Sequence, residues 1–437
     1  MAGGLGTRMR SATPKHLHPL LGRRMVDWAV EAVRALEPDP LVVVCSPDSE
    51  PALAGSLDGA ALAVQGEARG TGDAVAAARE ALSGFDGDVL VVPGDAPLLT
   101  SRLLEDALET HRRERPALTL VTVEPDRPRP YGRLVRDERG RVRAIVEATD
   151  ASPEQLAIRE LNASIYVFAA ADLWSALERL DTHNAQGELY LTDAIATLVD
   201  GGRAVATVRA GDATEADGVN TRGELALAAA ALRDRINARH LEAGVTIVDP
   251  QSTWIDAGVE LEPDTVIEPF TVLRGRTRVG REAVIGPHAV IVDAVVGERT
   301  LVGPFCYVRP GTVLEAGAKA GTFVEIKNAR IGEGAKVPHL SYVGDADIGA
   351  ETNVGAGTIT ANFPHEPGRP KGRTTIGRNV RVGIQNGFEA PVRIGDGAWI
   401  GGGSYITDDV PPDSLAIART RQVTKEGYLR GKRNDGD

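Results

Sequence analysis

Aliphatic residues recur every six positions in the second half of the chain. The longest run passes through Ile376, Val382, Phe388, Ile394, Ile400 and Ile406. Shorter runs precede it, namely Val279, Ile285 and Ile291; Val296, Val302, Val308 and Leu314; Ile331, Val337 and Val343; and Ile348 and Val354. A period of six fits neither an α-helix nor an ordinary strand, which repeat after about 3.6 and about two residues. It is typical of a solenoid in which each unit makes one short strand and one corner. We therefore predict a parallel β-helix of hexapeptide repeats over about 259–417.

The first 220 residues have a different pattern, in which short β-branched runs alternate with stretches of helical periodicity. Such alternation is typical of a Rossmann-like α/β domain, where helices flank a mostly parallel sheet. The expected strands are Leu41–Cys45, Val89–Val92, Leu118–Val123 and Ser164–Phe168.

A third pattern lies between these two parts. From Arg222 to Leu241, residues Leu225, Ala228, Leu232, Ile236 and Arg239 fall at spacings of three and four, which predicts one long amphipathic helix. A chain of 437 residues is too long for a single compact core, so we expect this helix to join two domains. The predicted division is 1–220 for the α/β domain, 221–244 for the linker helix, and 245–437 for the β-helix. A charged tail from about 425 is expected to fray.

Composition narrows the class of protein. The net charge of −12 argues against binding to nucleic acid and to anionic membranes. Only two cysteines occur, Cys45 and Cys306, and neither a secretory leader nor a run of about 18 apolar residues is visible. We expect a soluble protein of the cytoplasm.

The first candidate site combines a Gly-rich turn with nearby cations. The turn GGLGTRM precedes a helical pattern and has Arg8, Arg10 and Lys15 close by, a combination that suits nucleotide phosphates. Asp95 follows an apolar strand in VLVVPGDAPLL, at the strand end where α/β sheets place catalytic and metal-binding groups. The simpler alternative is that Asp95 caps a helix before Pro97.

Longer motifs sharpen this site. GGLGTRM followed by PKHLHPL resembles the sugar-nucleotide pyrophosphorylases, and Gln65 with GTGDA resembles their base-recognition loop. The match continues in order through YGR at 131–133, IVEATDA at 145–151, NAQGELYLTD at 184–193 and GVN at 218–220.

The second candidate site lies in the solenoid, in the segment RPG…TFVEIKNARIGEGAKVPHLSYVGDADIG…NVGAGTITAN. His339 stands in PHLSY, and stacking of neighbouring coils should bring Lys327, Tyr342, Asn353 and Asn362 toward it. The five histidines outside the solenoid are expected to be ordinary surface or core residues, namely His16, His18, His111, His183 and His240. The insertion NFPHEPGRPKGRT at 362–374 is either a binding loop or a tolerated surface insertion.

Together these motifs resemble one family along essentially the whole chain. It is the bacterial bifunctional family that combines N-acetylglucosamine-1-phosphate uridyltransferase with glucosamine-1-phosphate N-acetyltransferase. The resemblance implies a nucleotidyltransferase domain followed by a left-handed parallel β-helix, with Mg²⁺ as cofactor and UTP and acetyl-CoA as co-substrates. Glucosamine 1-phosphate and N-acetylglucosamine 1-phosphate would be the sugar substrates, and the protein would form a homotrimer with acetyl-CoA between neighbouring subunits.

The resemblance also assigns roles in the first site. Asp95 and Asn220 would hold Mg²⁺, and Arg8 and Lys15 would neutralise the triphosphate. The residues implied in binding UTP and the product nucleotide sugar are Met1, Ala2, Gly3, Gly4, Arg8, Lys15, Gln65, Gly70, Thr71, Gly132, Glu147, Asn162 and Asn220.

In the second site, the resemblance makes His339 the general base, consistent with histidine titrating near neutral pH. Arg309, Lys327, Tyr342 and Asn353 would bind the sugar phosphate. The residues implied in binding acetyl-CoA are Ala356, Asn362, Phe363, Lys371, Ile384, Gly402 and Arg419, with Asn362 and the Phe363 N–H polarising the thioester carbonyl.

The chain departs from the family at a few positions. Pro93 replaces an aromatic residue, Ser164 replaces a glycine, and Ile384 and Gly402 replace a serine and an alanine. The family also begins with a short apolar strand ahead of the Gly-rich loop, and Met1 stands where that strand ends, so we expect the natural start to lie a few codons upstream. Two alternatives remain open: an acetyltransferase alone, and a non-catalytic regulatory subunit.

Overall fold

The computed structural model describes residues 1–437 except 5, 127–128, 365–367, 369, 429 and 431–437, so most of the expected tail lies outside the described residues. The chain forms two compact units, Met1–Leu232 and Arg233–Asp437. The long helix α8 (Arg222–Glu242) carries the chain from the first unit into the second and covers the predicted helix.

The first unit is an α/β structure. Its helices are α1 (Met25–Arg34), α2 (Glu50–Leu53), α3 (Thr71–Ala76), α4 (Ser101–Glu114), α5 (Pro153–Leu156), α6 (Ala170–Leu177) and α7 (Asp193–Asp200), with 3₁₀ turns at Thr7–Met9, Lys15–Leu17 and Ala213–Ala216. Its strands are β1 (Pro19–Leu20), β2 (Arg23–Arg24), β3 (Leu41–Cys45), β4 (Ala60–Val64), β5 (Asp88–Val91), β6 (Leu118–Val123), β7 (Arg133–Arg136), β8 (Val142–Val146), β9 (Leu161–Ala169) and β10 (Val205–Arg209). The predicted strands Leu41–Cys45 and Leu118–Val123 are confirmed at both ends, and the other two within a few residues.

Strand β9 organises the larger sheet of this unit. It is antiparallel to β5, β6 and β7, while β10 is parallel to β6. Because β5, β6 and β7 all oppose β9, they run in one direction, and β10 shares it. The expectation of a mostly parallel sheet is confirmed, with β9 reversed in the middle and β8 reversed beyond β7.

The core of the first unit lies on both faces of this sheet. All six side chains of β6 are buried, and its four apolar residues are divided between two apolar clusters. Leu118 and Leu120 join Phe168 in one cluster, whereas Val121 and Val123 join Val167 in the other. Burial on both faces explains why β6 carries apolar or β-branched residues at all six positions, without a charged residue on either face.

Strands β3 and β4 form a separate parallel pair, and the first two residues of the chain lie between that pair and β5. The Ala2 N–H donates to the Val44 carbonyl at 2.6 Å. Met1 donates its amino N–H to the Val92 carbonyl at 2.8 Å and accepts from the Gly94 N–H at 2.7 Å. Alternate bonding to two neighbours is the pattern of a parallel strand inside a sheet.

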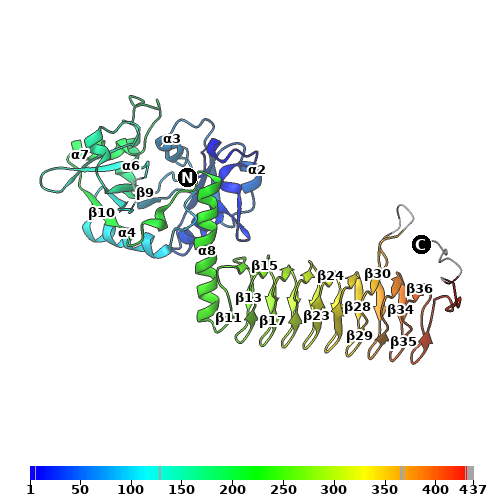
Figure 1. Ribbon diagram of the computed structural model, residues 1–437. Coiled ribbons are helices and arrows are strands. Elements are labelled where there is room, and N and C mark those ends of the chain that lie inside the picture. Colours follow the sequence, from blue (N-terminus) through cyan, green and yellow to red (C-terminus); the bar gives the residue numbers. More distant parts are fainter. Residues whose placement is uncertain (5, 127–128, 365–367, 369, 429, 431–437) are drawn as a thin grey trace, which may run out of the picture. The chain divides into compact units, whose positions relative to one another are not determined.

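The second unit is a solenoid of three parallel sheets, whose short strands stack coil on coil (Figure 1). The ten-stranded sheet holds β11 (Thr246–Ile247), β14 (Val266–Ile267), β17 (Val284–Ile285), β20 (Leu301–Val302), β23 (Lys319–Thr322), β26 (Lys336–His339), β29 (Asn353–Val354), β32 (Arg381–Val382), β35 (Trp399–Ile400) and β37 (Leu415–Ala416). The nine-stranded sheet holds β12 (Trp254–Ile255), β15 (Val272–Arg274), β18 (Val290–Val292), β21 (Tyr307–Val308), β24 (Glu325–Lys327), β27 (Tyr342–Gly344), β30 (Ile359–Ala361), β33 (Gly387–Glu389) and β36 (Tyr405–Ile406). The eight-stranded sheet holds β13 (Glu260–Leu261), β16 (Arg278–Val279), β19 (Val295–Val296), β22 (Val313–Leu314), β25 (Arg330–Ile331), β28 (Ala346–Ile348), β31 (Thr374–Ile376) and β34 (Val392–Ile394).

The six-residue repeat is the core of this solenoid. Every residue of the runs that start at Val279 and end at Ile406 is at most 4% exposed, which confirms the predicted left-handed parallel β-helix. The repeat begins one coil earlier than expected, because Ile247 and Ile255 are also buried. The glycine after the aliphatic residue is needed for close approach: a Cβ at Gly349 would lie 2.6 Å from the backbone of Gly377 on the next coil.

The linking helix has buried contacts within each unit. Ala228 and Leu232 pack against Met25 and Leu98 of the first unit. In the second unit, Asn237 donates to the carbonyls of Pro250 and Thr253 at 2.8 and 3.1 Å. Among the described residues, no helix combines the length and the apolar character that a membrane span requires.

Candidate functional site

The Gly-rich turn is shaped by contacts that leave no room for side chains. Gly6 has a φ of +61°, and a Cβ there would lie 2.5 Å from the Lys15 side chain. A Cβ at Gly3 would lie 2.4 Å from the Gln65 amide oxygen. The expected helix after the turn is only a 3₁₀ turn, Thr7–Met9, and α1 begins at Met25. Free N–H groups for a phosphate would therefore come from the loop itself.

The cations and oxygen ligands of the predicted site converge. Lys15 makes an ion pair with Asp95 and also donates to the Asn220 amide oxygen at 2.9 Å. Arg8 donates to the same amide oxygen at 2.9 Å. Asn220 reaches Asp95 because the Val219 N–H donates to the Asp95 carbonyl at 2.8 Å. Two oxygen ligands thus face one cation, which is the donor set that a hard, partly hydrated Mg²⁺ takes.

Charge compensation keeps Asp95 ionised although it is largely buried. Burial favours the neutral acid, but the charges of Lys15 and His16 outweigh it and lower the pKa of Asp95 below its ordinary value. Asp95 is not the cap of the next helix, because the Thr100 hydroxyl accepts from the Leu103 N–H at the start of α4. The helix-cap alternative is therefore wrong.

A pocket of about 470 Å³ surrounds these groups. Ten of the predicted residues line it, namely Met1, Gly3, Gly4, Arg8, Lys15, Gln65, Gly70, Thr71, Asp95 and Asn220. Gly70 has a φ of +114°, and a Cβ there would lie 2.5 Å from the Leu189 carbonyl. The Thr71 hydroxyl accepts from the Leu191 N–H at 2.9 Å, which ties this loop to the segment after residue 188. Ala2 is buried in the core beside Cys45.

The three predicted sugar-binding residues form a cluster of their own. The Asn162 N–H donates to the Gly132 carbonyl at 2.8 Å, and a Cβ at Gly132 would lie 3.4 Å from a Glu147 carboxylate oxygen. Glu147 accepts from the Thr192 hydroxyl at 3.1 Å. Burial raises the pKa of Glu147 above its ordinary value despite that hydrogen bond.

The second site is built by stacking equivalent positions of neighbouring coils. Tyr307, Glu325 and Tyr342 lie in one column of the nine-stranded sheet, and the Arg309 N–H donates to the carbonyl of Ile326, the residue before Lys327, at 2.8 Å. Arg309 forms an ion pair with Glu325 at 2.8 Å. Residues about one coil apart in the sequence therefore lie next to each other in the structure.

A buried carboxylate anchors the next column. Asp345 is 8% exposed; it accepts from the Asn328 amide at 2.5 Å and from the Asn362 amide. Burial would raise the pKa of Asp345, but these bonds and the charges of Lys327 and Lys371 lower it below its ordinary value. The Lys327 ammonium in turn lowers the pKa of Lys371. Two adjacent ammonium groups form a site suited to an anion such as phosphate.

His339 ends strand β26, where the chain turns toward β27. Its side chain is exposed, and within the described part of the chain its ring makes no hydrogen bond. The turn after it is fixed by Ser341, whose hydroxyl donates to the His339 carbonyl at 2.7 Å. Asn353 lies on the next coil, opposite Lys336 of the same strand.

The predicted acetyl-CoA residues lie along successive coils. The Ala356 carbonyl accepts from the Gln385 N–H at 2.7 Å, beside exposed Ile384. Arg419 donates to the Gly402 carbonyl at 2.8 Å. Phe363 is 74% exposed, and the Lys371 ammonium lies 5.8 Å from the centre of its ring. The rest of the insertion falls partly outside the described residues.

Sequence reasoning missed several residues of the first site. His16, Ser164 and Glu188 also line the pocket. His16 was expected to be an ordinary surface or hydrogen-bonded core histidine; it is 3% exposed, but its Nδ1 has no hydrogen-bond partner in the described structure. Burial lowers the pKa of His16 to about 4. Its position directly after Lys15 in the sequence could have indicated that it lies at the site. His111, by contrast, is a hydrogen-bonded core residue, and His183 is exposed, as predicted.

Comparisons with known proteins cover both units. Residues 1–246 match the family model of the MobA-like NTP transferase domain. Over 99% of its length the chain is 46% identical to the bifunctional protein GlmU of Mycolicibacterium vanbaalenii and covers 92% of that protein. It is 45% identical to the bifunctional protein GlmU of Mycobacterium tuberculosis (strain H37Ra), with 99% and 92% of the two chains covered. It is also 46% identical to the bifunctional protein GlmU of Streptomyces avermitilis, with 99% of this chain and 94% of that protein covered.

Proposed function

Since this chain belongs to the family of bifunctional GlmU proteins, we propose that its two units make UDP-N-acetylglucosamine in two steps. The β-helix acetylates glucosamine 1-phosphate with acetyl-CoA. The α/β unit then joins the resulting N-acetylglucosamine 1-phosphate to the uridylyl group of UTP. Similarity over 99% of the chain, across both units, does not favour an acetyltransferase alone or a regulatory subunit.

In the uridyltransferase site, a phosphate oxygen of N-acetylglucosamine 1-phosphate attacks the α-phosphorus of UTP, and pyrophosphate leaves. Phosphoryl-transfer catalysis is mainly positioning and charge neutralisation. Arg8 and Lys15 neutralise the triphosphate, and Asp95 and Asn220 hold Mg²⁺. The metal supplies further neutralisation of the phosphate oxygens. The observation that carries this proposal is that Arg8 and Lys15 both bond to Asn220 and that Lys15 also pairs with Asp95.

The remaining predicted residues select the substrates of this site. Gln65 contacts the uracil from a fixed position, because its amide donates to the Asp73 carboxylate at 2.9 Å. Gly70 and Thr71 complete that loop. Gly132, Glu147 and Asn162 bind the sugar, and Met1, Ala2, Gly3 and Gly4 approach the nucleotide through their backbone.

In the acetyltransferase site, the amine nitrogen of glucosamine 1-phosphate attacks the thioester carbonyl while His339 takes its proton, and the CoA thiolate leaves. Arg309 and Lys327 bind the sugar phosphate, with Tyr342 and Asn353 on the sugar. Asn362 and the Phe363 N–H stabilise the developing oxyanion. Ala356, Lys371, Ile384, Gly402 and Arg419 line acetyl-CoA. The pair formed by Lys327 and Lys371 supports an anionic substrate here, because two adjacent cations repel each other without one.

We also propose that the protein is a homotrimer, since a three-faced prism packs against two copies of itself and cyclic symmetry closes the contact surface. Exposed His339 and Phe363 are consistent with a site that a neighbouring subunit completes. Sedimentation should give three times the chain mass. A monomer that acetylates at full rate would contradict both the trimer and the shared site.

Two assays on the purified full chain test the proposed function. Thiol release from acetyl-CoA should depend on glucosamine 1-phosphate and should be unaffected by EDTA. Pyrophosphate release from UTP should depend on N-acetylglucosamine 1-phosphate and should stop with EDTA and return with Mg²⁺. Absence of either sugar-dependent release would reject the corresponding half of the proposal.

A further inference from the structure

Gln65 lines the substrate pocket, and its neighbours fix the direction of its side-chain amide. It directly follows β4 and is 6% exposed. Its amide nitrogen donates to the Asp73 carboxylate at 2.9 Å and to the Gly70 carbonyl at 3.2 Å. An amide nitrogen carries two hydrogens, so these two bonds use both of them. The amide can therefore offer only its oxygen to a ligand.

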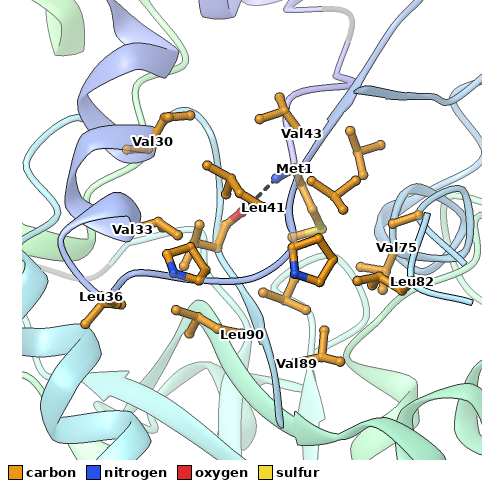
Figure 2. Close-up of a pocket in the computed structure, with 18 of the residues that line it drawn as sticks. Met1, Val30, Val33, Leu36, Leu41, Val43, Val75, Leu82, Val89 and Leu90 are labelled. Atoms are coloured by element: carbon orange, nitrogen blue, oxygen red, sulfur yellow. Dashed lines mark hydrogen bonds between the residues drawn. The ribbon is translucent and has the colours of Figure 1, made fainter. Parts of the chain in front are cut away.

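The free oxygen of Gln65 faces the Gly-rich turn. A Cβ at Gly3 would lie 2.4 Å from this oxygen, and both residues line the pocket of about 470 Å³. An apolar cavity of about 350 Å³, lined by residues of β3 and β5, is a separate space, because neither Gln65 nor Asp73 lines it (Figure 2). At this point the substrate pocket thus presents a hydrogen-bond acceptor, without a donor from the same amide.

Asp73 holds the amide in this orientation. It lies in the first turn of α3, its side chain is 13% exposed, and its second oxygen accepts from the Arg69 guanidinium at 2.8 Å. A carboxylate only accepts hydrogen bonds, so it binds the nitrogen of Gln65 and repels the oxygen. If a neutral amide replaced the carboxylate, Arg69 would bind its carbonyl and turn its NH₂ group toward Gln65. The Gln65 amide would then turn over and direct its nitrogen into the pocket.

The direction of the Gln65 amide decides which pyrimidine base it can bind. The base of a uridine nucleotide has a single N–H group, at N3, which an acceptor can bind. Cytosine has a lone pair at the same position, so the Gln65 oxygen would face a second acceptor there. A site built for one hydrogen bond rejects the analogue that leaves a buried polar group unpaired.

We propose that Asp73 is the positioning residue through which the site selects uracil over cytosine, because it holds the Gln65 oxygen toward the N3–H of the base. Asp73 acts through Gln65 and does not itself contact the nucleotide. The inference rests on the proposed uridylyl transfer and adds to it the origin of the base selectivity.

Calorimetric titration of the full-length protein with UTP or CTP, in the presence of Mg²⁺ and without a sugar phosphate, measures this selectivity apart from catalysis. The wild-type protein should bind UTP more tightly than CTP. Asp73→Asn should lower the ratio of the two affinities at least about tenfold, because the turned amide loses the bond to uracil N3–H and donates to cytosine N3. The ratio of kcat/KM values for pyrophosphate release with N-acetylglucosamine 1-phosphate should fall in parallel.

Two further variants separate this role from a structural one. Adding Arg69→Leu to Asp73→Asn should restore the preference for UTP, because the new amide is then free to turn its carbonyl toward Gln65. Damage to the fold would not be repaired by a second substitution of this kind. Asp172→Asn is the matched control, since Asp172 lies in the first turn of α6, pairs with Arg203 and has a side chain that is 16% exposed. It should leave the ratio unchanged.

An unchanged ratio in Asp73→Asn, or an equal weakening of UTP and CTP binding, would overturn the proposal. So would a wild-type protein that binds CTP as tightly as UTP, a result that does not depend on the folding of any variant. If the wild-type protein bound neither nucleotide, the proposed uridylyl transfer would itself be rejected, and this inference with it.

Discussion

The two candidate sites are assembled in opposite ways. The first gathers Arg8, Lys15, Asp95 and Asn220 from loops that span about half the chain, and they already bond to one another. The second gathers its residues by stacking neighbouring coils, and two of them, His339 and Phe363, stand exposed. Charges that are satisfied within the chain make a site rigid before substrate arrives, whereas exposed groups gain their partners only on binding.

The largest effect is expected at the internally paired site. Asp95→Ala should abolish Mg²⁺-dependent pyrophosphate release and leave thiol release unchanged, because it removes the carboxylate and leaves Lys15 without its ion-pair partner. Both assays on the same preparation provide the measurement. Pyrophosphate release that survives at ordinary Mg²⁺ would show that Asp95 is not the metal ligand.

At the exposed site, His339→Ala should lower acetyl transfer by about 100- to 10,000-fold while pyrophosphate release stays at the wild-type rate. The unfolding curve should not move, because the His339 ring makes no hydrogen bond within the described residues. Near wild-type thiol release would remove His339 from the mechanism.

Asp345 is the exception inside the exposed site, since it is buried and internally paired like Asp95. Asp345→Ala should cost about 1–3 kcal/mol of unfolding free energy by leaving the buried Asn362 amide unpaired, and should raise the KM for acetyl-CoA. The matched control is Asp347→Ala, two residues away, which breaks a half-exposed ion pair with Arg373 and should cost at most about 1 kcal/mol. Equal losses of unfolding free energy in the two variants would show that the Asp345 carboxylate stabilises the fold no more than the Asp347 carboxylate does.

Buried His16 predicts acid sensitivity of the first unit. Its pKa is about 4 in the folded protein, against an ordinary value of 6.5, so between these values the unfolded chain binds a proton that the folded chain does not. Stability should therefore fall as pH drops through this window, by about 2 kcal/mol from His16 at pH 5. Denaturant unfolding in metal-free buffer at pH 7 and 5 measures the loss, and His16→Leu should reduce it. The same loss in the variant would assign the acid sensitivity to other groups.

The smallest effect concerns Ser164, at which the family resemblance leads us to expect a glycine and whose φ is +59°. A non-glycine residue in this region carries about 1–2 kcal/mol of strain, offset in part by the greater entropy of unfolded glycine. Ser164→Gly should therefore stabilise the first unit by about 0.5–1 kcal/mol. Ala163→Gly is the control and should destabilise, because Ala163 is a buried strand residue without that strain. A loss of stability in Ser164→Gly would mean that the hydroxyl matters more than the strain.

How far each site could be predicted from the sequence depends on whether it is built from stacked coils or from distant loops. In the solenoid, the six-residue repeat fixes which residues share a column, so the proximity of Lys327 to Asn328, Asp345 and Asn362 follows from spacing alone. In the α/β unit, no spacing relates Lys15 to Asp95 or Asn220, and family motifs were needed. The role of Asp345 and the position of His16 at the pocket were both missed, because a single charged or aromatic residue in a motif does not reveal its packing.

The solenoid also tolerates changes of length at one corner. Ile331 pairs with Ile348 and Ile348 pairs with Ile376, although the second interval carries the whole insertion after Asn362. The coils on either side therefore keep their register across this longer loop. This corner is a natural cloning position: a tag, a reporter or a second binding module could be grafted there while the stacked coils continue undisturbed.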